Sequence, residues 1–294
     1  MDSTDGPDAQ FQEHRAHLRS VAYRMLGSLT EADDAVQETW LRLTRSDPAG
    51  VQNLRGWLTT VVSRICLDML RARAIRREDP LDDVHVPDPV VSMVGDDPAE
   101  HAVLADSVGL ALLVVLDTLA PAERLAFVLH DVFGVPFDQI GPILDRTPAA
   151  AKQLASRARH RLRGTSGQAP APDPAVQRAV ADAFLAAARE GDFEGLLAVL
   201  DPSVVLRADA GSSPLGPSRL VRGATAVATQ AGRFAHLSRH AQPVLVNGGP
   251  GFLVARDHRP VALIGMTVRD GRIVEIDILT DPERLLRLVP ELLA

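Results

Sequence analysis

The chain has 294 residues, of which 46% are hydrophobic and 23% charged, a composition typical of a folded protein with two or three domains. The formal net charge is −7, and no apolar run is long enough to predict a membrane span. The acidic N-terminus, MDSTDGPDAQ, excludes a secretory signal or basic transit peptide, so we expect a cytoplasmic protein. The single cysteine, Cys66, excludes an internal disulfide, and its apolar neighbours predict a buried thiol.

The charges of this acidic chain are arranged in blocks. Six arginines and one acid lie between residues 55 and 77, whereas nine acids and no Lys or Arg lie between residues 78 and 106. A second basic block follows at residues 146–163, with six bases and no acid. Because such blocks create local fields that the net charge conceals, nucleic acid remains a possible partner.

The first part of the chain predicts three helices. They cover residues 11–26, residues 30 to about 44, where Thr30 opens a capping-box-like start, and residues 53 to about 77, where Asn53 is the expected cap. The second of these helices has an inward apolar stripe of Ala32, Val36, Trp40 and Leu43. Its outward face is acidic and amide-rich, with Asp33, Asp34, Gln37, Glu38 and Arg42.

An acidic, proline-rich linker without helical period follows at residues 78–98, and helices are expected again at residues 99–119 and 121–132. The next stretch, VPFDQIGPILDRTPAAAKQLASRARHRL, has the outline of a helix-turn-helix. Its first helix would cover residues 137–144, with Pro142 predicting either a kink or a late start. Asp145 is expected to take the left-handed conformation of the turn.

The second helix of this unit would start at Pro148, with Thr147 as its N-cap. Its apolar stripe, which would pack on the preceding helices, consists of Ala151, Leu154, Ala155, Ala158 and Leu162. Its outer face carries Lys152, Gln153, Ser156, Arg159, His160 and Arg163. Lys and Arg can bond guanine and Gln can bond adenine in the major groove, so the pattern favours a DNA-reading helix. A solvated helix end that attracts cations is the alternative.

The C-terminal part differs from the rest of the chain, because its pattern predicts mainly strands. After the proline-rich residues 164–174, a helix is expected at residues 175–189, followed by strands in AQPVLVNG, GFLVAR, PVALIGMTV and RIVEIDIL. Asp270-Gly271 between the last two predicts a two-residue hairpin. These signals predict a separate α+β domain.

Long stretches of the chain resemble the extracytoplasmic-function (ECF) sigma factors of the sigma-70 family. LRSVAYRMLGSLTEADDAVQETWLRL and LRGWLTTVVSRICLDMLRAR resemble region 2, and LDTLAPAERLAFVLHDVFGVPFDQIGPIL with TPAAAKQLASRARHRL resembles region 4. The C-terminal part resembles a SnoaL-like cone of the NTF2 type. The resemblance implies a multidomain chain of two all-α helical domains followed by an α+β cone: region 2 at 8–79, an acidic linker at 80–98, region 4 at 99–164, a linker at 165–174 and the cone at 175–294.

This resemblance implies partners and site residues. Core RNA polymerase, through its β′ clamp helices and β flap, would be a partner, and the clamp helices would be bound by Asp33, Asp34, Gln37, Glu38, Trp40 and Leu41. The promoter −10 element would be held by Trp57, Arg64, Arg71, Arg73, Arg76 and Arg77. The −35 element would be read by Thr147, Lys152, Gln153, Ser156, Arg157, Arg159 and His160. An ordinary solvated face on the second helix and a core role for Trp57 are the competing interpretations.

Cones of the resembling type enclose an apolar pocket, in which relatives use an Asp or a His for proton abstraction. The candidates here are Asp209, His236, His240, His258 and Asp277, and no pair of them has a diagnostic spacing. In the resembling subgroup the cone modulates the sigma core in place of a separate anti-sigma protein. Two of its signatures are missing, because this linker reads DPLDDVHVPDPV and DAGSSPLG stands after the first cone strand. A contact between cone and core would then be made differently.

We therefore expect a non-enzymatic ECF-type sigma factor without cofactor or metal, which binds core RNA polymerase and promoter DNA. Its cone would tune activity through intramolecular contact and could hold a small ligand. Two alternatives remain open at this point. The chain could be an isomerase or cyclase-like enzyme with an accessory helix-turn-helix, or a helix-turn-helix repressor that never contacts polymerase.

Overall fold

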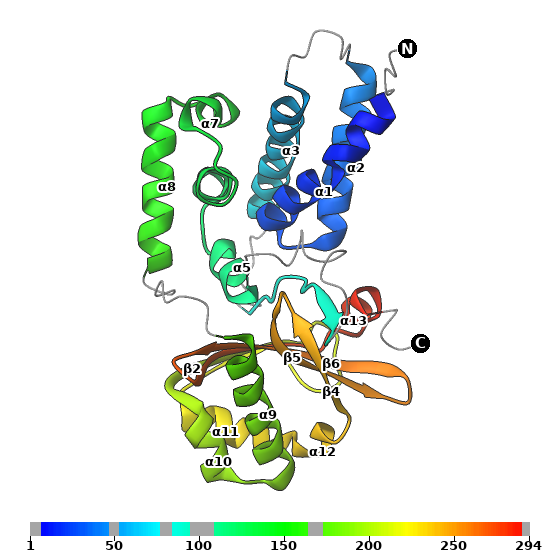
Figure 1. The fold of residues 1–294 in the computed structure, drawn as a ribbon, viewed down its shortest axis with the longest axis vertical. Helices are drawn as coiled ribbons and strands as arrows, with labels where there is room; N and C mark the ends of the chain where they lie inside the picture. The colour runs from blue at the N-terminus through cyan, green and yellow to red at the C-terminus, as the bar shows by residue number, and fades with distance from the viewer. Residues whose placement is uncertain (1–6, 47–52, 77–83, 95–108, 164–172, 290–294) are drawn as a thin grey trace. The chain divides into compact units, whose positions relative to one another are not determined.

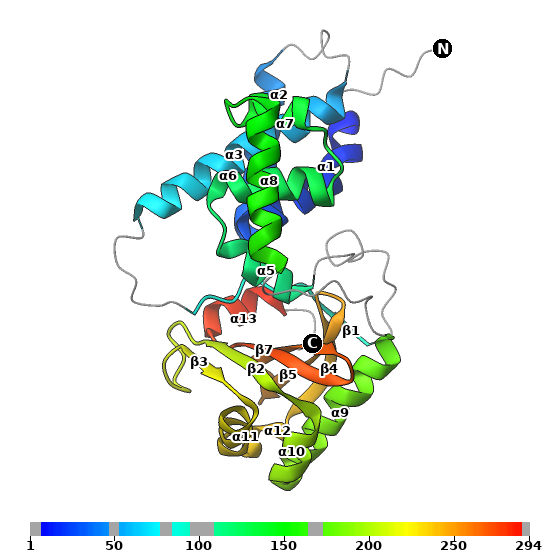
Figure 2. The same cartoon turned by 90° about the vertical axis from the view of Figure 1, so that its left-hand side faces the viewer.

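The structure is a computed structural model that describes residues 7–46, 53–76, 84–94, 109–163 and 173–289. The chain divides into two compact units (Figures 1 and 2). The helical unit contains residues 1–80 and 115–167, and the sheet unit contains residues 81–114 and 168–294. The described residues of the predicted linker, 84–94, therefore belong to the same unit as the C-terminal part of the chain.

The helical unit starts with three packed helices, α1 (Pro7–Leu26), α2 (Leu29–Arg45) and α3 (Leu54–Arg76). Helix α2 starts earlier than predicted, because Ser28 and not Thr30 is the N-cap that accepts from the Glu31 amide. The Asn53 cap is confirmed, with its Oδ1 accepting from the Gly56 amide at 2.9 Å. Cys66 is fully buried, as predicted, in the core that these helices share.

The helix-turn-helix is the second part of the helical unit. Its elements are α6 (Pro121–Phe127), the π-helical turn η2 (Val128–Val132), α7 (Phe137–Ile143) and α8 (Pro148–Arg163). The predicted cap and turn are confirmed, because Thr147 Oγ1 accepts from the Ala150 amide at 3.2 Å and Asp145 has a φ of 54°. The late start of the first helix is wrong: α7 starts at Phe137, and Pro142 falls in its last turn, where few backbone bonds remain to be lost.

A buried arginine joins α6 to α1 within this unit. Arg124 on α6 is 2% exposed, pairs with Asp117 and donates from Nε to the Arg24 carbonyl of α1 at 3.1 Å. Asp117 ends α5 (Leu110–Asp117), whose first residues belong to the sheet unit. Removing one partner of such a buried pair is costly, so Arg124 is a structural residue.

The sheet unit contains a seven-stranded mixed sheet in the order β1-β4-β5-β6-β7-β2-β3. All neighbouring strands are antiparallel except β2 and β7, which are parallel. The strands are β1 (Val91–Met93), β2 (Leu200–Asp209), β3 (Arg219–Arg222), β4 (Ala241–Val246), β5 (Gly249–Arg256), β6 (Arg259–Arg269) and β7 (Arg272–Leu279). The predicted hairpin is confirmed, since Asp270 and Gly271 have φ values of 48° and 72°.

The two faces of this sheet are covered by different parts of the chain. Helices α9 (Pro174–Glu190), α10 (Phe193–Val199), α11 (Ala224–Arg233) and α12 (Ala235–Ser238) cover the inner face (Figure 2). Helix α13 (Pro282–Leu288), the linker and the start of α5 cover the outer face, in a core that includes Val86, Val91, Leu110 and Leu285. The result is the α+β cone that the sequence predicts, with one addition. The sequence predicted no strand in the linker, yet β1 extends the sheet by pairing with β4.

Candidate functional site

Helix α8 presents one buried and one exposed face. Ala151, Ala155 and Ala158 are fully buried, which confirms the predicted apolar stripe. The side chains on the opposite face are exposed: Lys152, Gln153, Ser156, Arg157 and His160. Because these side chains are exposed polar groups on a helix, they can bond base edges and phosphates.

Two further basic residues of α8 make contacts within the helical unit. Arg159 is half-buried, and its Nε lies 2.7 Å from Asp131 Oδ1 of η2. Arg161 donates from Nη1 to Glu123 of α6 at 2.7 Å. Thr147 is occupied as the N-cap of the helix. These residues position α8 on the preceding helices.

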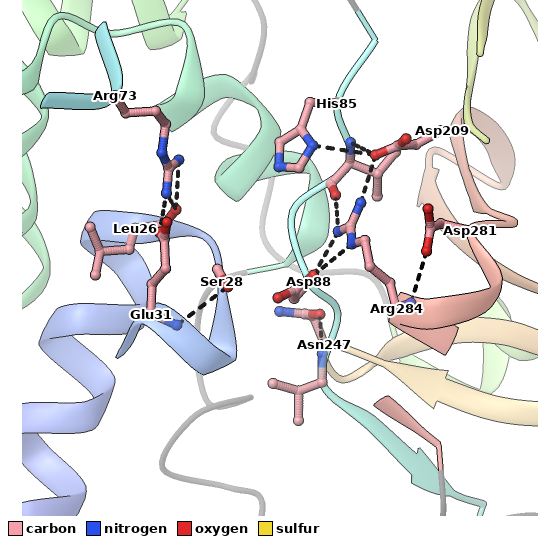
Figure 3. A network of polar contacts seen from close by, with 12 residues as sticks. Leu26, Ser28, Glu31, Arg73, His85, Asp88, Asp209, Asn247, Asp281 and Arg284 are labelled. Carbon is pink, nitrogen blue, oxygen red and sulfur yellow. Dashed lines mark hydrogen bonds and ion pairs between the residues drawn. The ribbon is translucent and has the colours of Figure 1, made fainter. Parts of the chain in front are cut away.

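The arginines of α3 are held differently from those of α8. Arg64 is exposed and donates from Nη2 to the Pro142 carbonyl of α7 at 2.9 Å. Arg73 pairs with Glu31 and donates to the Leu26 carbonyl, as Figure 3 shows. Arg71 is exposed and lies 3.6 Å from Asp68. Trp57 is half-buried, Arg76 lies in the last turn of α3, and Arg77 lies outside the described residues.

The predicted polymerase-docking face on α2 is partly solvated and partly paired. Asp34, Gln37 and Leu41 are exposed. Asp33 accepts two bonds from Arg19 at 2.6 and 3.0 Å, and Glu38 accepts from Arg42 at 3.0 Å. Trp40 is half-buried, with its ring 5.0 Å from that of Phe11. The face therefore presents an exposed acid, an amide and an apolar side chain together.

Within the sheet unit, a set of polar contacts binds the linker to the outer face of the sheet (Figure 3). We call this set the linker clasp; it consists of Asp209, Asn247 and Arg284 with linker residues 85–90. Arg284 of α13 donates to Asp88 Oδ1 at 2.7 and 2.9 Å, to the Val86 carbonyl at 2.6 Å and to Asp209 at 2.7 Å. Its guanidinium thus joins linker, sheet and helix with few donors left for water.

The other two members of the clasp satisfy the linker backbone. Asp209 Oδ2 accepts from the Val86 amide at 3.0 Å, and Asn247 exchanges two bonds with Val90 at 3.0 and 2.8 Å. Burial alone would raise the pKa of Asp209, but bonds from His85 and the Val86 amide and the charge of Arg284 outweigh it, so the pKa is lowered. Asp209 is therefore ionised at neutral pH and attractive to Arg284.

A second arginine cluster lies on the outer face of the sheet. Arg207 of β2 lies 2.9 Å from Asp277 and 3.4 Å from Glu275, both on β7. Asp277 is 3% exposed, and burial raises its pKa to about 6 although Arg207 acts in the opposite direction. Arg207 therefore neutralises two acids that burial would otherwise make very unfavourable.

None of the five candidate catalytic residues lines the cavity between the sheet and its inner helices. Along β2 and β7 the side chains alternate between faces, so Asp209 and Asp277 point to the outer face. His236, His240 and His258 are also not among the cavity-lining residues. Among the described residues, no group of three or more His, Cys, Asp or Glu could hold a metal ion. No helix of the described part is long and apolar enough to cross a membrane.

Sequence reasoning missed Arg284, Asn247 and Asp88. Arg284 follows Asp281, which caps α13, so the local sequence predicts a helix start but not a partner almost two hundred residues away. Asn247 has a φ of 49° in a hairpin, which is a turn signal and gives no hint of linker binding. The missing linker signature was the one available clue that a different contact replaces it.

Comparison with known proteins identifies the helical part of the chain. Residues 10–75 match the family described as Sigma-70 region 2, and residues 109–162 match Sigma-70, region 4. A probable ECF RNA polymerase sigma factor, SigI of Mycobacterium tuberculosis, is 36% identical to this chain, and the match covers 99% of both. The ECF RNA polymerase sigma factor SigJ of the same species is 37% identical over 94% of this chain and 92% of its own.

A solved structure extends the comparison to the fold. The crystal structure of the M. tuberculosis extracytoplasmic function sigma factor SigJ superimposes with a TM-score of 0.75 at 34% identity, covering 94% of this chain and 97% of SigJ. Since these relatives are sigma factors over their whole length, neither the enzyme nor the repressor alternative is favoured. The chain belongs to the ECF RNA polymerase sigma factors of the sigma-70 family.

Proposed function

We propose that this sigma factor, whose family directs RNA polymerase to promoters, is regulated by its own cone through the linker clasp. The observation that carries the proposal is Arg284, which bonds the backbone and a carboxylate of the linker while pairing with Asp209 of the sheet. The linker joins the two regions that contact promoter DNA. A cone that holds it restricts how these regions can separate when they bind their two promoter elements.

The −35 element would be read by α8. Lys152, Gln153 and Ser156 stand near the start of the helix on its exposed face, where a recognition helix contacts base edges. Arg157 and His160 continue this face and would contact phosphates. Thr147 and Arg159 would support these contacts by capping the helix and joining it to η2.

The −10 element would be held by α3, after two of its arginines release their present partners within the helical unit. Arg71 is exposed and available for a phosphate, with Trp57, Arg76 and Arg77 completing the proposed set. Arg64 and Arg73 would first release the Pro142 carbonyl and Glu31. The contact between Arg64 and Pro142 joins regions 2 and 4, so binding of DNA by Arg64 would loosen the packing of the two regions.

The protein would act in the cytoplasm, where its helix α2 would bind core RNA polymerase. The exposed Asp34, Gln37 and Leu41, flanked by Asp33, Glu38 and Trp40, combine charge, amide and apolar groups in the mixture found at protein interfaces. The β′ clamp helices are the proposed partner of this face, and the β flap is the proposed partner of region 4.

The regulatory proposal is tested by opening the clasp in the full chain. Arg284→Met keeps an apolar side chain on α13 and removes the hydrogen bonds that the Arg284 guanidinium donates to the linker. We expect faster hydrogen exchange of the Val86 and Val90 amides and a several-fold change in transcription from a cognate promoter with purified core polymerase. Arg287→Met, at an exposed position of the same helix, is the matched control and should change neither. An open clasp with unchanged transcription would refute the regulatory role.

A further inference from the structure

The inner face of the sheet carries a cavity of about 130 Å³. Its walls are apolar side chains from the sheet, including Leu206, Phe252 and Ile276, and from the covering helices, including Phe184 and Phe234. Small-molecule sites have this character: an apolar enclosure with a few polar groups that fix orientation. The polar groups of this cavity therefore decide what it can bind.

Arg219 of β3 is the single charged residue among the described residues that line the cavity. Its Nε is buried and has no hydrogen-bond partner among the described residues. One terminal nitrogen reaches the Leu215 carbonyl at 3.4 Å, and the guanidinium lies 5.5 Å from the centre of the Phe234 ring. A buried guanidinium donor without an acceptor is unfavourable, and a ligand carboxylate can accept from two of its nitrogens at once.

The size of the cavity limits the ligand to about one ring. An engineered apolar cavity of roughly 150 Å³ in another protein binds benzene. A molecule of this size with one carboxylate would place its ring against the apolar walls and its charge at Arg219. Among the described residues that line the cavity there is no second cation, so a dicarboxylate or a phosphate monoester, each with more than one negative charge, would leave charge unpaired.

Residues that line the cavity are adjacent in the chain to residues of the linker clasp and of the α13 cap. On β2, Asp209 holds the linker on the outer face, and the next residue, Ala210, lines the cavity. Thr280 lines the cavity as well, and its amide bonds the Asp209 carbonyl at 2.9 Å. The next residue, Asp281, caps α13 at the Arg284 amide.

The loop at 211–218 connects the cavity to the same cap. Leu215 lines the cavity, and the Ser212 amide donates to Asp281 at 3.4 Å. Gly211 has a φ of 48° and lies so close to the Asp281 carboxylate that a side chain there would collide with it. A ligand that displaces this loop would therefore act on the cap of the helix that carries Arg284.

We infer that the cone cavity binds a small apolar monocarboxylic acid through Arg219, and that its occupancy alters the linker clasp. The binding site rests on the cavity alone, whereas the coupling rests on the proposed regulation by the clasp. The two parts therefore need separate measurements on the same protein.

Binding is tested by titrating the full chain with benzoate and with its neutral analogue benzamide, followed by the methyl signals of the cone in NMR spectra. Benzoate should bind about tenfold or more tightly than benzamide, and Arg219→Gln should remove that preference. Arg222→Gln, at an exposed position of the same strand, is the matched control and should keep it. Ile264→Phe, which fills the cavity, should prevent binding of both compounds.

Equal binding of benzoate and benzamide, or an unchanged benzoate affinity in folded Arg219→Gln, would overturn the site. So would the absence of benzoate binding to the wild-type chain. Coupling is measured by hydrogen exchange of the Val86 and Val90 amides with and without benzoate, where a change of about threefold or more is expected. Benzoate binding without such a change would overturn the coupling and leave the site intact, and the Arg284→Met experiment tests the clasp independently.

Discussion

The outer face of α8 and the outer face of the cone sheet both depend on arginine, but they use it in opposite ways. On α8, the cationic side chains of Lys152 and Arg157 are exposed. On the outer side of the sheet, the side chains of Arg207 on β2 and Arg284 on α13 are only 17% and 16% exposed, and both pair with carboxylates of their own unit. The contrast shows that burial, and not residue type, distinguishes these exposed cations of α8 from the two arginines that hold the sheet unit to itself.

The largest effect that this comparison predicts is on the stability of the cone. Arg207→Met would leave Glu275 and Asp277 buried without their cation, which should lower the free energy of unfolding of the cone by about 3–5 kcal/mol. Chemical denaturation of the full chain measures this loss. Arg222→Met removes a positive charge from an exposed position of β3 and should stay within about 0.5 kcal/mol of the wild type. Similar stability of the two variants would show that burial does not distinguish these arginines.

The two carboxylates that pair with these arginines, Asp277 and Asp209, should affect the stability of the cone in opposite ways as the pH changes. The pKa of Asp277 is raised to about 6, so the folded state holds its proton over a range where the unfolded state has lost it. The stability of the wild type relative to Asp277→Asn should therefore fall by about 3 kcal/mol in total as the pH rises from below the unfolded pKa of about 4 to above the folded pKa of about 6. Asp209 has a lowered pKa, so its contribution is present above about pH 4 and is lost as the pH falls further. Denaturation of Asp277→Asn and Asp209→Asn across pH measures both, and slopes of the same sign would contradict the assignment.

The sequence predicted the elements whose signals are local. The Thr147 cap, the left-handed Asp145 and the Asp270-Gly271 hairpin depend on neighbouring residues, and the structure confirms all three. The buried stripe of α8 follows from helical periodicity and is also confirmed. These local signals predicted elements, whereas the family was inferred from the resemblance of long stretches whose motifs stand in the order typical of that family.

The linker clasp could not be predicted in this way, because its partners are distant in the chain. Prolines and acidic residues at 78–98 indicate a linker, whereas the attachment of residues 85–90 to Arg284 and Asn247 depends on how the cone folds. Whether Asp209 and Asp277 face the cavity or the outer side of the sheet depends on the strand register. A shift of the register by one residue would exchange the two faces, and the sequence alone does not specify it. The register therefore explains why the catalytic candidates fell outside the cavity.

On α8 the comparison predicts a change in DNA recognition without a change in stability. The double variant Lys152→Ala, Gln153→Ala removes exposed groups, so its unfolding should match the wild type within about 0.5 kcal/mol. Loss of base contacts should weaken discrimination between a cognate and an altered −35 element by about 10–100-fold. Competition binding of the polymerase holoenzyme to the two promoters gives the ratio. Arg233→Ala, which removes a positive charge from the cone, should leave the ratio unchanged; unchanged discrimination by the double variant would instead show that α8 does not read this element.

Helix α3 carries both an exposed and a partly buried arginine, so it allows the two kinds to be compared within one helix. Arg73 is partly buried against Glu31 and the Leu26 carbonyl, so Arg73→Ala should lower the stability of the helical unit by about 1–2 kcal/mol. Arg71 is exposed, and its 3.6 Å pair with Asp68 is of the kind that contributes little to stability, so Arg71→Ala should unfold like the wild type. Each variant should also lower the salt dependence of promoter binding by about one phosphate contact, if both arginines reach DNA. A salt slope that changes in Arg71→Ala but not in Arg73→Ala would assign Arg73 to the fold alone, and the −10 contact would then depend on the exposed arginines, as on α8.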